Sequence, residues 1–172
     1  TSLGLVFLDL DRFKNVNDSL GHEIGDVLPK AVGERLLGAV RKGDTVARLS
    51  GDEFTFVLAD IAHVDDVARV SQKILDVFAH PFHIGDRELF VTASMGITLY
   101  PFDEKDVQGL LRNADVAMYR AKEVSRNSYQ FYTAEMTAKA EEFLSLENDL
   151  RHAVERNELF LEYQPVVSTR EG

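Results

Sequence analysis

Two carboxylates follow the first apolar run of the chain, where a buried strand is expected to end. The run occupies residues 3–8, and Asp9 and Asp11 come directly after it. Because side chains alternate along a strand, Asp9 and Asp11 can point to one face while Leu10 points to the other. The backbone carbonyl of Leu10 then remains available as a neutral oxygen ligand. The alternative is that both acids are solvated residues at a strand end.

A second acidic pair belongs to a predicted hairpin. Two short β-like runs flank Ser50-Gly51, a two-residue turn signal, and Asp52 and Glu53 come next. In the predicted topology this hairpin neighbours the first strand, so the two acidic pairs can share one edge of the sheet. Mg²⁺ prefers oxygen ligands, and two such ions can support phosphoryl transfer from a nucleoside triphosphate. The alternative for the second pair is an ordinary polar turn.

Basic side chains that can hold phosphates come near the end of a predicted helix. Lys122 and Arg126 are four residues apart and share a face if the helix continues. They can then clamp the β- and γ-phosphates of a nucleotide, and Lys14 is a third candidate. The alternative is a solvated, charged helix end.

The elements that would position these groups follow a β-α-β-β-α-β order with one more helix and strand. This order predicts an α+β fold with a ferredoxin-like core, a central antiparallel-rich sheet and a C-terminal extension helix. Residues 15–21 are expected to be a loop, and residues 133–157 one long helix or two joined ones. The predicted strands are residues 3–8, 45–49, 54–58, 82–84, 89–100, 129–132 and 159–167, and the other predicted helices are residues 22–40, 65–79 and 106–124.

Composition narrows the classes of partner. The 172 residues carry 19 basic and 29 acidic side chains, a net charge of −10, which argues against binding to nucleic-acid backbones. The chain has no cysteine, which excludes disulfides and thiolate metal sites. No apolar run reaches the roughly 18 residues of a membrane span. A cytoplasmic setting is expected, with any membrane attachment of the parent protein through a region N-terminal to this chain.

Three blocks of sequence, in order, resemble the GGDEF domain family. They are residues 9–26 (DLDRFKNVNDSLGHEIGD), 48–54 (RLSGDEF) and 114–122 (ADVAMYRAK). The resemblance runs from about residue 3 to 132 and implies a GGDEF domain over residues 1–132, without the helix that precedes its first strand in the family.

The C-terminal part resembles the opening of a second family. Residues 146–167 (LENDLRHAVERNELFLEYQPVV) are similar to the start of EAL domains, which hydrolyse cyclic di-GMP. The expected organisation is a helical linker over residues 133–157 and a truncated EAL domain over residues 158–172. The metal-binding motifs of the EAL family are absent, so phosphodiesterase activity is not expected of this chain.

Active GGDEF domains are diguanylate cyclases, and the resemblance implies that chemistry here. Two GTP molecules, one on each subunit of a homodimer, condense to cyclic di-GMP and two pyrophosphates with Mg²⁺ or Mn²⁺. The resemblance implies metal contacts from Asp9, the Leu10 carbonyl and Asp52. It also makes Asp52 or Glu53 the candidate base for the ribose 3′-hydroxyl.

The resemblance also assigns the nucleotide contacts. Asn17 and Asp26 fall on guanine-reading positions, although alone they also suit an Asx turn and an acid in the first turn of a helix. The remaining substrate-binding positions are Phe13, Lys14, Lys122 and Arg126. Arg41 and Asp44 match the RxxD inhibitory site, at which the product binds.

One departure from the family keeps a rival function open. Ser50 replaces the first glycine of the signature, adding a Cβ and a hydroxyl beside the nucleotide. The rival is a non-catalytic GTP-binding module, or a module that senses cyclic di-GMP through Arg41 and Asp44. Either would regulate an attached EAL phosphodiesterase.

Overall fold

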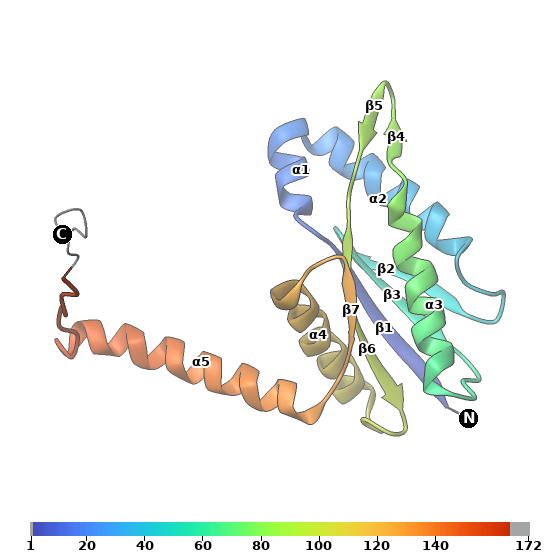
Figure 1. Cartoon of the computed structure of the whole chain (residues 1–172). Coiled ribbons are helices and arrows are strands. Elements are labelled where there is room, and N and C mark those ends of the chain that lie inside the picture. Colours follow the sequence, from blue (N-terminus) through green and yellow to red (C-terminus); the bar gives the residue numbers. More distant parts are fainter. Residues whose placement is uncertain (1, 166–172) are drawn as a thin grey trace, which may run out of the picture. The chain divides into compact units, whose positions relative to one another are not determined.

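The structure, a computed structural model, describes residues 2–165 and has a five-stranded sheet at its centre (Figure 1). The strand order is β2-β3-β1-β6-β7, with antiparallel pairs except for the parallel pair β6–β7. This is the predicted α+β, antiparallel-rich βαββαβ core with one strand added at the edge. The strands are β1 (Leu3–Leu10), β2 (Thr45–Ser50), β3 (Glu53–Leu58), β6 (Ala93–Tyr100) and β7 (Ser128–Phe131).

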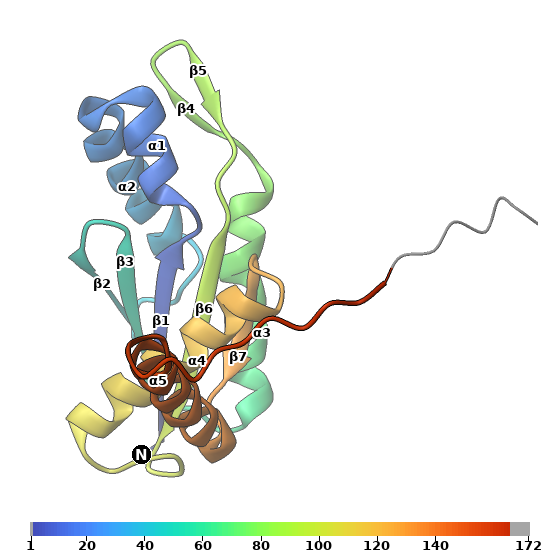
Figure 2. The same ribbon diagram turned by 90° about the vertical axis from the view of Figure 1, so that its left-hand side faces the viewer.

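The two faces of β1 follow from its alternating side chains. Val6 and Leu8 join the main core with residues of α2 (His22–Leu37) and α3 (Val64–Asp76). Leu5 belongs to a smaller cluster with residues of α4 (Val107–Val124). Figures 1 and 2 show α4 on one side of the sheet and α2 and α3 on the other. Odd-numbered β1 residues, Asp9 among them, therefore face α4.

A glycine in β6 lets α4 lie close to the sheet. A Cβ built at Gly96 would lie 1.9 Å from the carbonyl oxygen of Ala114 and 2.2 Å from the backbone nitrogen of Met118. Any larger residue at position 96 would push α4 outward. Because α4 carries Lys122, this contact sets how near that ammonium comes to the exit of β1.

Three local predictions are wrong. Residues 15–21 are not a loop, because α1 (Phe13–Leu20) places Phe13, Val16 and Leu20 at helical spacing and buries Phe13. The run 89–100 is not one strand: β5 (Arg87–Leu89) pairs only with β4 (Phe82–Ile84), and β6 begins at Ala93. The predicted hairpin turn shifts by one residue, because Ser50 already pairs with Glu53 and the tight turn is Gly51-Asp52, beside a register irregularity.

The chain divides into two compact units, residues 1–137 and residues 138–172. The predicted long helix forms as one helix, α5 (Ala134–Glu155). Of the predicted strand at 159–167, residues 159–165 form no strand, and residues 166–167 lie outside the described residues. Within residues 2–165, none of the helices combines the length and apolar character needed to cross a membrane.

Candidate active site

The exit of β1 brings together acidic groups from two strands and a lysine from a helix. Asp9 lies directly opposite Glu53 in the β1–β3 register, so both side chains lie on the face that α4 covers. Lys122 of α4 reaches this pair, with its Nζ 2.8 Å from Asp9 Oδ1. The sequence predicted that these three residues would serve one site, and the fold brings them to one place.

The charges around Asp9 are imperfectly matched. Burial raises the pKa of the Asp9 carboxyl above its ordinary value, and the negative charges of Asp52 and Glu53 raise it further. The hydrogen bond and positive charge of Lys122 oppose this increase without cancelling it. One ammonium therefore sits among three neighbouring carboxylates, and the site retains an excess of negative charge.

The turn between β2 and β3 fixes the second acidic pair. The carbonyl oxygen of Asp52 accepts a hydrogen bond from the Leu10 backbone N–H at 3.2 Å, which ties the turn to the exit of β1. Arg48 donates from Nε and Nη2 to the Gly51 carbonyl oxygen, at 2.9 and 2.6 Å. Ser50 Oγ donates to Glu53 Oε2 at 2.6 Å. The sequence pattern did not predict this last bond, because the pairing of Ser50 with Glu53 depends on the shifted turn.

The donor set at this edge fits a magnesium ion. In the part of the chain that the structure describes, no group of three or more His, Cys, Asp or Glu side chains is arranged to hold a metal. Mg²⁺ does not need such a cage, because one or two carboxylates together with substrate phosphates usually bind it. Asp9 and Asp52 supply carboxylates beside the backbone of Leu10. A cation there would also lie against the negative charges of Asp52 and Glu53, which add to the effect of burial on the pKa of Asp9.

Asp11 does not join this acidic group, although the alternation along β1 had suggested that it could. Its carboxylate is buried and accepts three hydrogen bonds. Thr92 Oγ1 and Ser94 Oγ each donate at 2.7 Å, and the backbone N–H of Asn127 donates at 3.1 Å. Both carboxylate oxygens of Asp11 therefore accept hydrogen bonds from within the fold.

Asp115 of α4 lies next to the site. In the sequence it belongs only to the block of residues 114–122, and it is not among the predicted site residues. It stands seven residues before Lys122, two helical turns away on the same face. Partial burial raises the pKa of its carboxyl, and the charge of Glu53 raises it further while Lys122 opposes them. The spacing of Asp115 and Lys122 was the available signal for this neighbour.

Asn17 offers an unpaired hydrogen-bond acceptor between α1 and α2. Its Oδ1 is buried and has no partner among the described residues. A Cβ built at Gly25 would lie 1.7 Å from that oxygen, so only glycine lets Asn17 take this place. Asp26 is exposed one residue further along α2. A buried acceptor without a partner is costly and suits a ligand that supplies a donor.

The start of α1 is open to an anion. Arg12 precedes the helix in the left-handed conformation, with φ 57°, and no side chain caps the first N–H groups. The ring of Phe13 is buried in the core, so only its backbone can meet a ligand, whereas Lys14 is exposed. Free N–H groups at a helix N-terminus and a nearby ammonium suit phosphate oxygens.

Comparison with known proteins identifies the architecture around these groups. The sequence profile of one family, described as "Diguanylate cyclase, GGDEF domain", matches residues 1–128. The chain belongs to the GGDEF family. The crystal structure of an EAL/GGDEF domain protein from M. capsulatus is 48% identical with a TM-score of 0.74, covering 77% of this chain and 86% of that one.

Two curated relatives from Pseudomonas aeruginosa extend the similarity beyond the GGDEF domain. The bifunctional diguanylate cyclase/cyclic di-GMP phosphodiesterase MucR is 45% identical over 168 residues, 98% of this chain and 24% of that protein. The cyclic di-GMP phosphodiesterase NbdA is 41% identical over 170 residues, 99% of this chain and 22% of that protein. The chain thus spans about a quarter of their length, and the match continues past residue 128.

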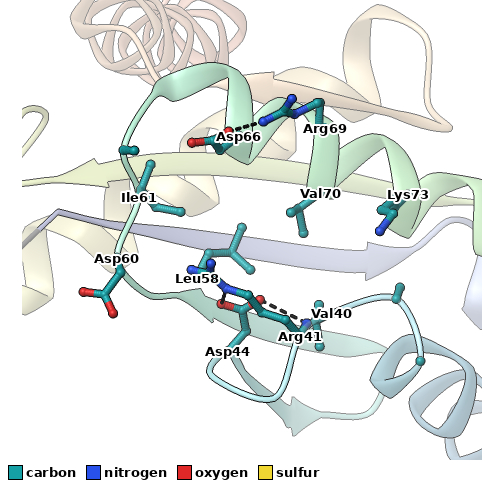
Figure 3. A pocket seen from close by; sticks show the side chains of 13 residues that line it. Val40, Arg41, Asp44, Leu58, Asp60, Ile61, Asp66, Arg69, Val70 and Lys73 are labelled. Carbon is teal, nitrogen blue, oxygen red and sulfur yellow. Dashed lines mark hydrogen bonds and ion pairs between the residues drawn. The ribbon is translucent and has the colours of Figure 1, made fainter.

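The predicted RxxD residues of this GGDEF domain line a separate hollow of about 550 Å³ (Figure 3). Arg41 Nε donates to Asp44 Oδ1 at 3.2 Å, and Arg41 also donates to the Ala59 carbonyl oxygen. Asp44 Oδ1 accepts from the Ala59 backbone N–H at 3.2 Å. Arg69 and Lys73 of α3 line the same hollow. The guanidinium of Arg41 is largely exposed, yet its orientation is fixed.

Arg126 lies apart from the acidic pair, on the β6 side of β1. It lines a hollow of about 590 Å³ together with Asp11, Arg12 and Phe90. Its φ of 44° places it in a left-handed turn just after the end of α4. Because α4 ends at Val124, Arg126 does not share a helix face with Lys122. Lys122 pairs with Asp9, whereas Arg126 lies in the turn whose Asn127 N–H bonds Asp11.

Proposed function

We propose that this chain carries a diguanylate cyclase site, which joins two GTP molecules into cyclic di-GMP with release of two pyrophosphates. The observation that carries the proposal is the convergence of Asp9, Glu53 and Lys122 at the exit of β1, with Asp52 in the adjoining turn. Each site holds one GTP, so the complete reaction needs two copies of the domain facing each other in a homodimer.

Proton removal is the first task of the chain's own residues. The ribose 3′-hydroxyl must lose its proton as it attacks the α-phosphorus of the other GTP, and a carboxylate at the β2–β3 turn can accept it. Glu53 is the candidate base that the geometry favours, because the Ser50 hydroxyl holds one of its oxygens and leaves the other free. Asp52 remains the second candidate, with its backbone tied to Leu10.

Charge neutralisation is the second task. Lys122 has three N–H donors, and its contact with Asp9 leaves two for phosphate oxygens. Lys14 and the uncapped start of α1 offer further donors to the triphosphate, and Arg126 adds a guanidinium. When bound, Mg²⁺ or Mn²⁺ supplies charge stabilisation to the phosphates and lowers the pKa of the attacking hydroxyl. Asp9, Asp52 and the Leu10 carbonyl would hold it.

Base selectivity depends on Asn17 of α1 and Asp26 of α2. The unpaired Oδ1 of Asn17 can accept from the exocyclic amine of guanine, and the exposed Asp26 carboxylate can accept from N1–H and N2–H₂. Adenine lacks the N1–H and N2–H₂ donor pair and presents an acceptor at N1 instead. GTP is therefore the expected substrate in preference to ATP.

A turnover assay tests this proposal. The full chain is incubated with GTP and Mg²⁺ at high protein concentration, so that weak dimers form, and cyclic di-GMP is measured by chromatography. Asp52→Asn serves as the control that keeps the size of the side chain but removes its charge. GTP binding without any cyclic di-GMP, in a sample shown to be dimeric, would reject the proposal.

A regulatory function is the second candidate, and two observations favour it. Ser50 occupies the first signature position, and the relative NbdA, a cyclic di-GMP phosphodiesterase by name, matches 99% of this chain. In this reading the domain binds GTP or cyclic di-GMP and controls an attached EAL phosphodiesterase.

Restoring the glycine separates the two candidates. If Ser50 is what prevents turnover, Ser50→Gly should produce cyclic di-GMP where the unchanged chain produces none. If the unchanged chain is already a cyclase, Ser50→Gly should change turnover only a few-fold, through loss of the bond to Glu53.

A further inference from the structure

Asp11 is a buried carboxylate that the proposed reaction does not use. Besides its three side-chain hydrogen bonds, its backbone N–H donates to the Thr92 carbonyl oxygen at 2.8 Å. One residue therefore links the end of β1, the beginning of β6 and the turn between α4 and β7. By contrast, the half-buried Asp103 accepts only from neighbours in the chain, the hydroxyl of Thr98 and the backbone N–H of Leu99.

The turn that Asp11 holds has an unusual backbone. Arg126 and Asn127 both have positive φ, 44° and 45°, a conformation that residues other than glycine adopt only where the surroundings enforce it. The hydrogen bond from the Asn127 N–H to Asp11 Oδ2 is such a restraint, and it is adjacent to Arg126 in the chain. The backbone at Arg126 is thus held by two bonds: its own N–H donates to the Ala121 carbonyl oxygen at 3.0 Å, and the next N–H donates to a carboxylate that is 116 residues earlier in the sequence.

We propose that Asp11 is a positioning residue for Arg126. By accepting from the Asn127 N–H it holds the α4–β7 turn in the conformation that directs the Arg126 guanidinium toward a bound triphosphate. The inference rests on the proposed function, because Arg126 is a phosphate contact only if GTP binds at the exit of β1. Asp11 itself touches no substrate.

Two substitutions separate this role from packing. Asp11→Ala removes every acceptor and releases the turn. Asp11→Asn can keep its amide oxygen on Thr92 and Asn127 while its amide N–H donates to the Ser94 hydroxyl, which accepts in turn. Asn should therefore restore much of what Ala loses. Asp103→Ala is the matched control, since it deletes a carboxylate with hydroxyl and backbone donors far from the turn.

Equilibrium binding of a fluorescent GTP analogue to the full chain with Mg²⁺ gives the decisive measurement. Asp11→Ala should weaken binding about tenfold, as expected for coupled neighbours, and Asp11→Asn should restore it to within about threefold. Asp103→Ala should lower the melting temperature without weakening binding. In an Arg126→Ala background, Asp11→Ala should have no further effect on binding, because the residue that it positions is already gone.

Other outcomes overturn the inference in distinguishable ways. If the unchanged chain binds no GTP analogue, the proposed function fails and this inference fails with it. If Arg126→Ala weakens binding but Asp11→Ala does not, or if the two effects simply add, the inference alone is wrong. Should Asp11→Ala not fold, Asp11→Ser replaces it, because its hydroxyl leaves space for a water beside the orphaned donors.

Discussion

The exit of β1 and the RxxD hollow are both lined by charged residues, but they match their charges differently. At the exit of β1, the ammonium of Lys122 pairs with Asp9, while Asp52 and Glu53 add two further negative charges nearby, so negative charge is left over. In the hollow, Arg41 and Asp44 neutralise each other and also bond the backbone of Ala59. The first region gains when a cation and its phosphates arrive, whereas the second offers a fixed guanidinium to a ligand that needs no cation.

The largest expected effect comes from removing a charge at the first region. Glu53→Gln should lower cyclic di-GMP formation by about 10²–10⁴-fold, the usual contribution of a general base, while leaving GTP binding nearly unchanged. Glu88→Gln is the matched control, because Glu88 is an exposed strand glutamate in the β4–β5 hairpin. Turnover that survives Glu53→Gln would move the role of base to Asp52.

The next effect tests the buried, unpaired acceptor Asn17 Oδ1, which lies against α2. Gly25→Ala places a methyl group onto Asn17 Oδ1, and the amide at the end of that side chain must move. The loss of one hydrogen bond to the base should weaken GTP binding by about 1–3 kcal/mol. Isothermal titration with GTP and Mg²⁺ measures the change.

Gly33→Ala is the control for Gly25→Ala on the same helix. A Cβ at Gly33 would meet only Phe54 Cε1 at 3.5 Å, an ordinary contact, so helix propensity should make this variant slightly more stable. GTP affinity that falls equally in both variants would show that α2 as a whole was disturbed and that Asn17 has no special part.

The sequence predicted the fold and the first region well for a physical reason. Continuous apolar runs identify strands, and helical spacing of apolar residues identifies helices. The end of the first apolar run locates the exit of β1. Register then brings Asp9 opposite Glu53, which the strand order implied. The errors were local: α1 is short and mostly polar, and its few apolar residues at helical spacing were missed.

Contacts between distant segments were beyond sequence reasoning. The three donors on Asp11 come from residues 92, 94 and 127, and nothing in their spacing connects them to β1. The Ser50–Glu53 bond likewise depends on a register irregularity that moves the turn by one residue. Single-residue shifts of this kind are decided by packing and not by pattern.

A smaller effect is expected in the second region. Arg41→Ala removes the exposed guanidinium and should weaken cyclic di-GMP binding about tenfold, the value of one good bidentate contact to guanine. GTP binding should not change, because Arg41 lies in a hollow separate from Asp9. Arg87→Ala, in the β4–β5 hairpin, is the control. Equilibrium dialysis with cyclic di-GMP and with GTP measures both affinities. An equal loss of affinity for the two nucleotides would contradict the separation of the two regions.

The smallest expected effect concerns the raised pKa of Asp115, beside the first region. Partial burial and Glu53 raise the pKa of Asp115 above its ordinary 3.8, so the folded protein holds that proton more tightly than the unfolded chain does. The contribution of Asp115 to stability is therefore present below pH 3.8 and is lost as the pH rises through the raised pKa.

Asp115→Asn should accordingly stabilise the protein at pH 7 and have no such effect below pH 3.8. Because Asp115 keeps contact with solvent, the gain should be at most about 1 kcal/mol. Urea unfolding at several pH values measures it, with Asp65→Asn, an exposed acid on α3, as the control. In a Glu53→Gln background the gain should shrink, because one of the charges that oppose Asp115 is gone. A gain of equal size at all pH values would mean that the substitution acts through packing and not through charge.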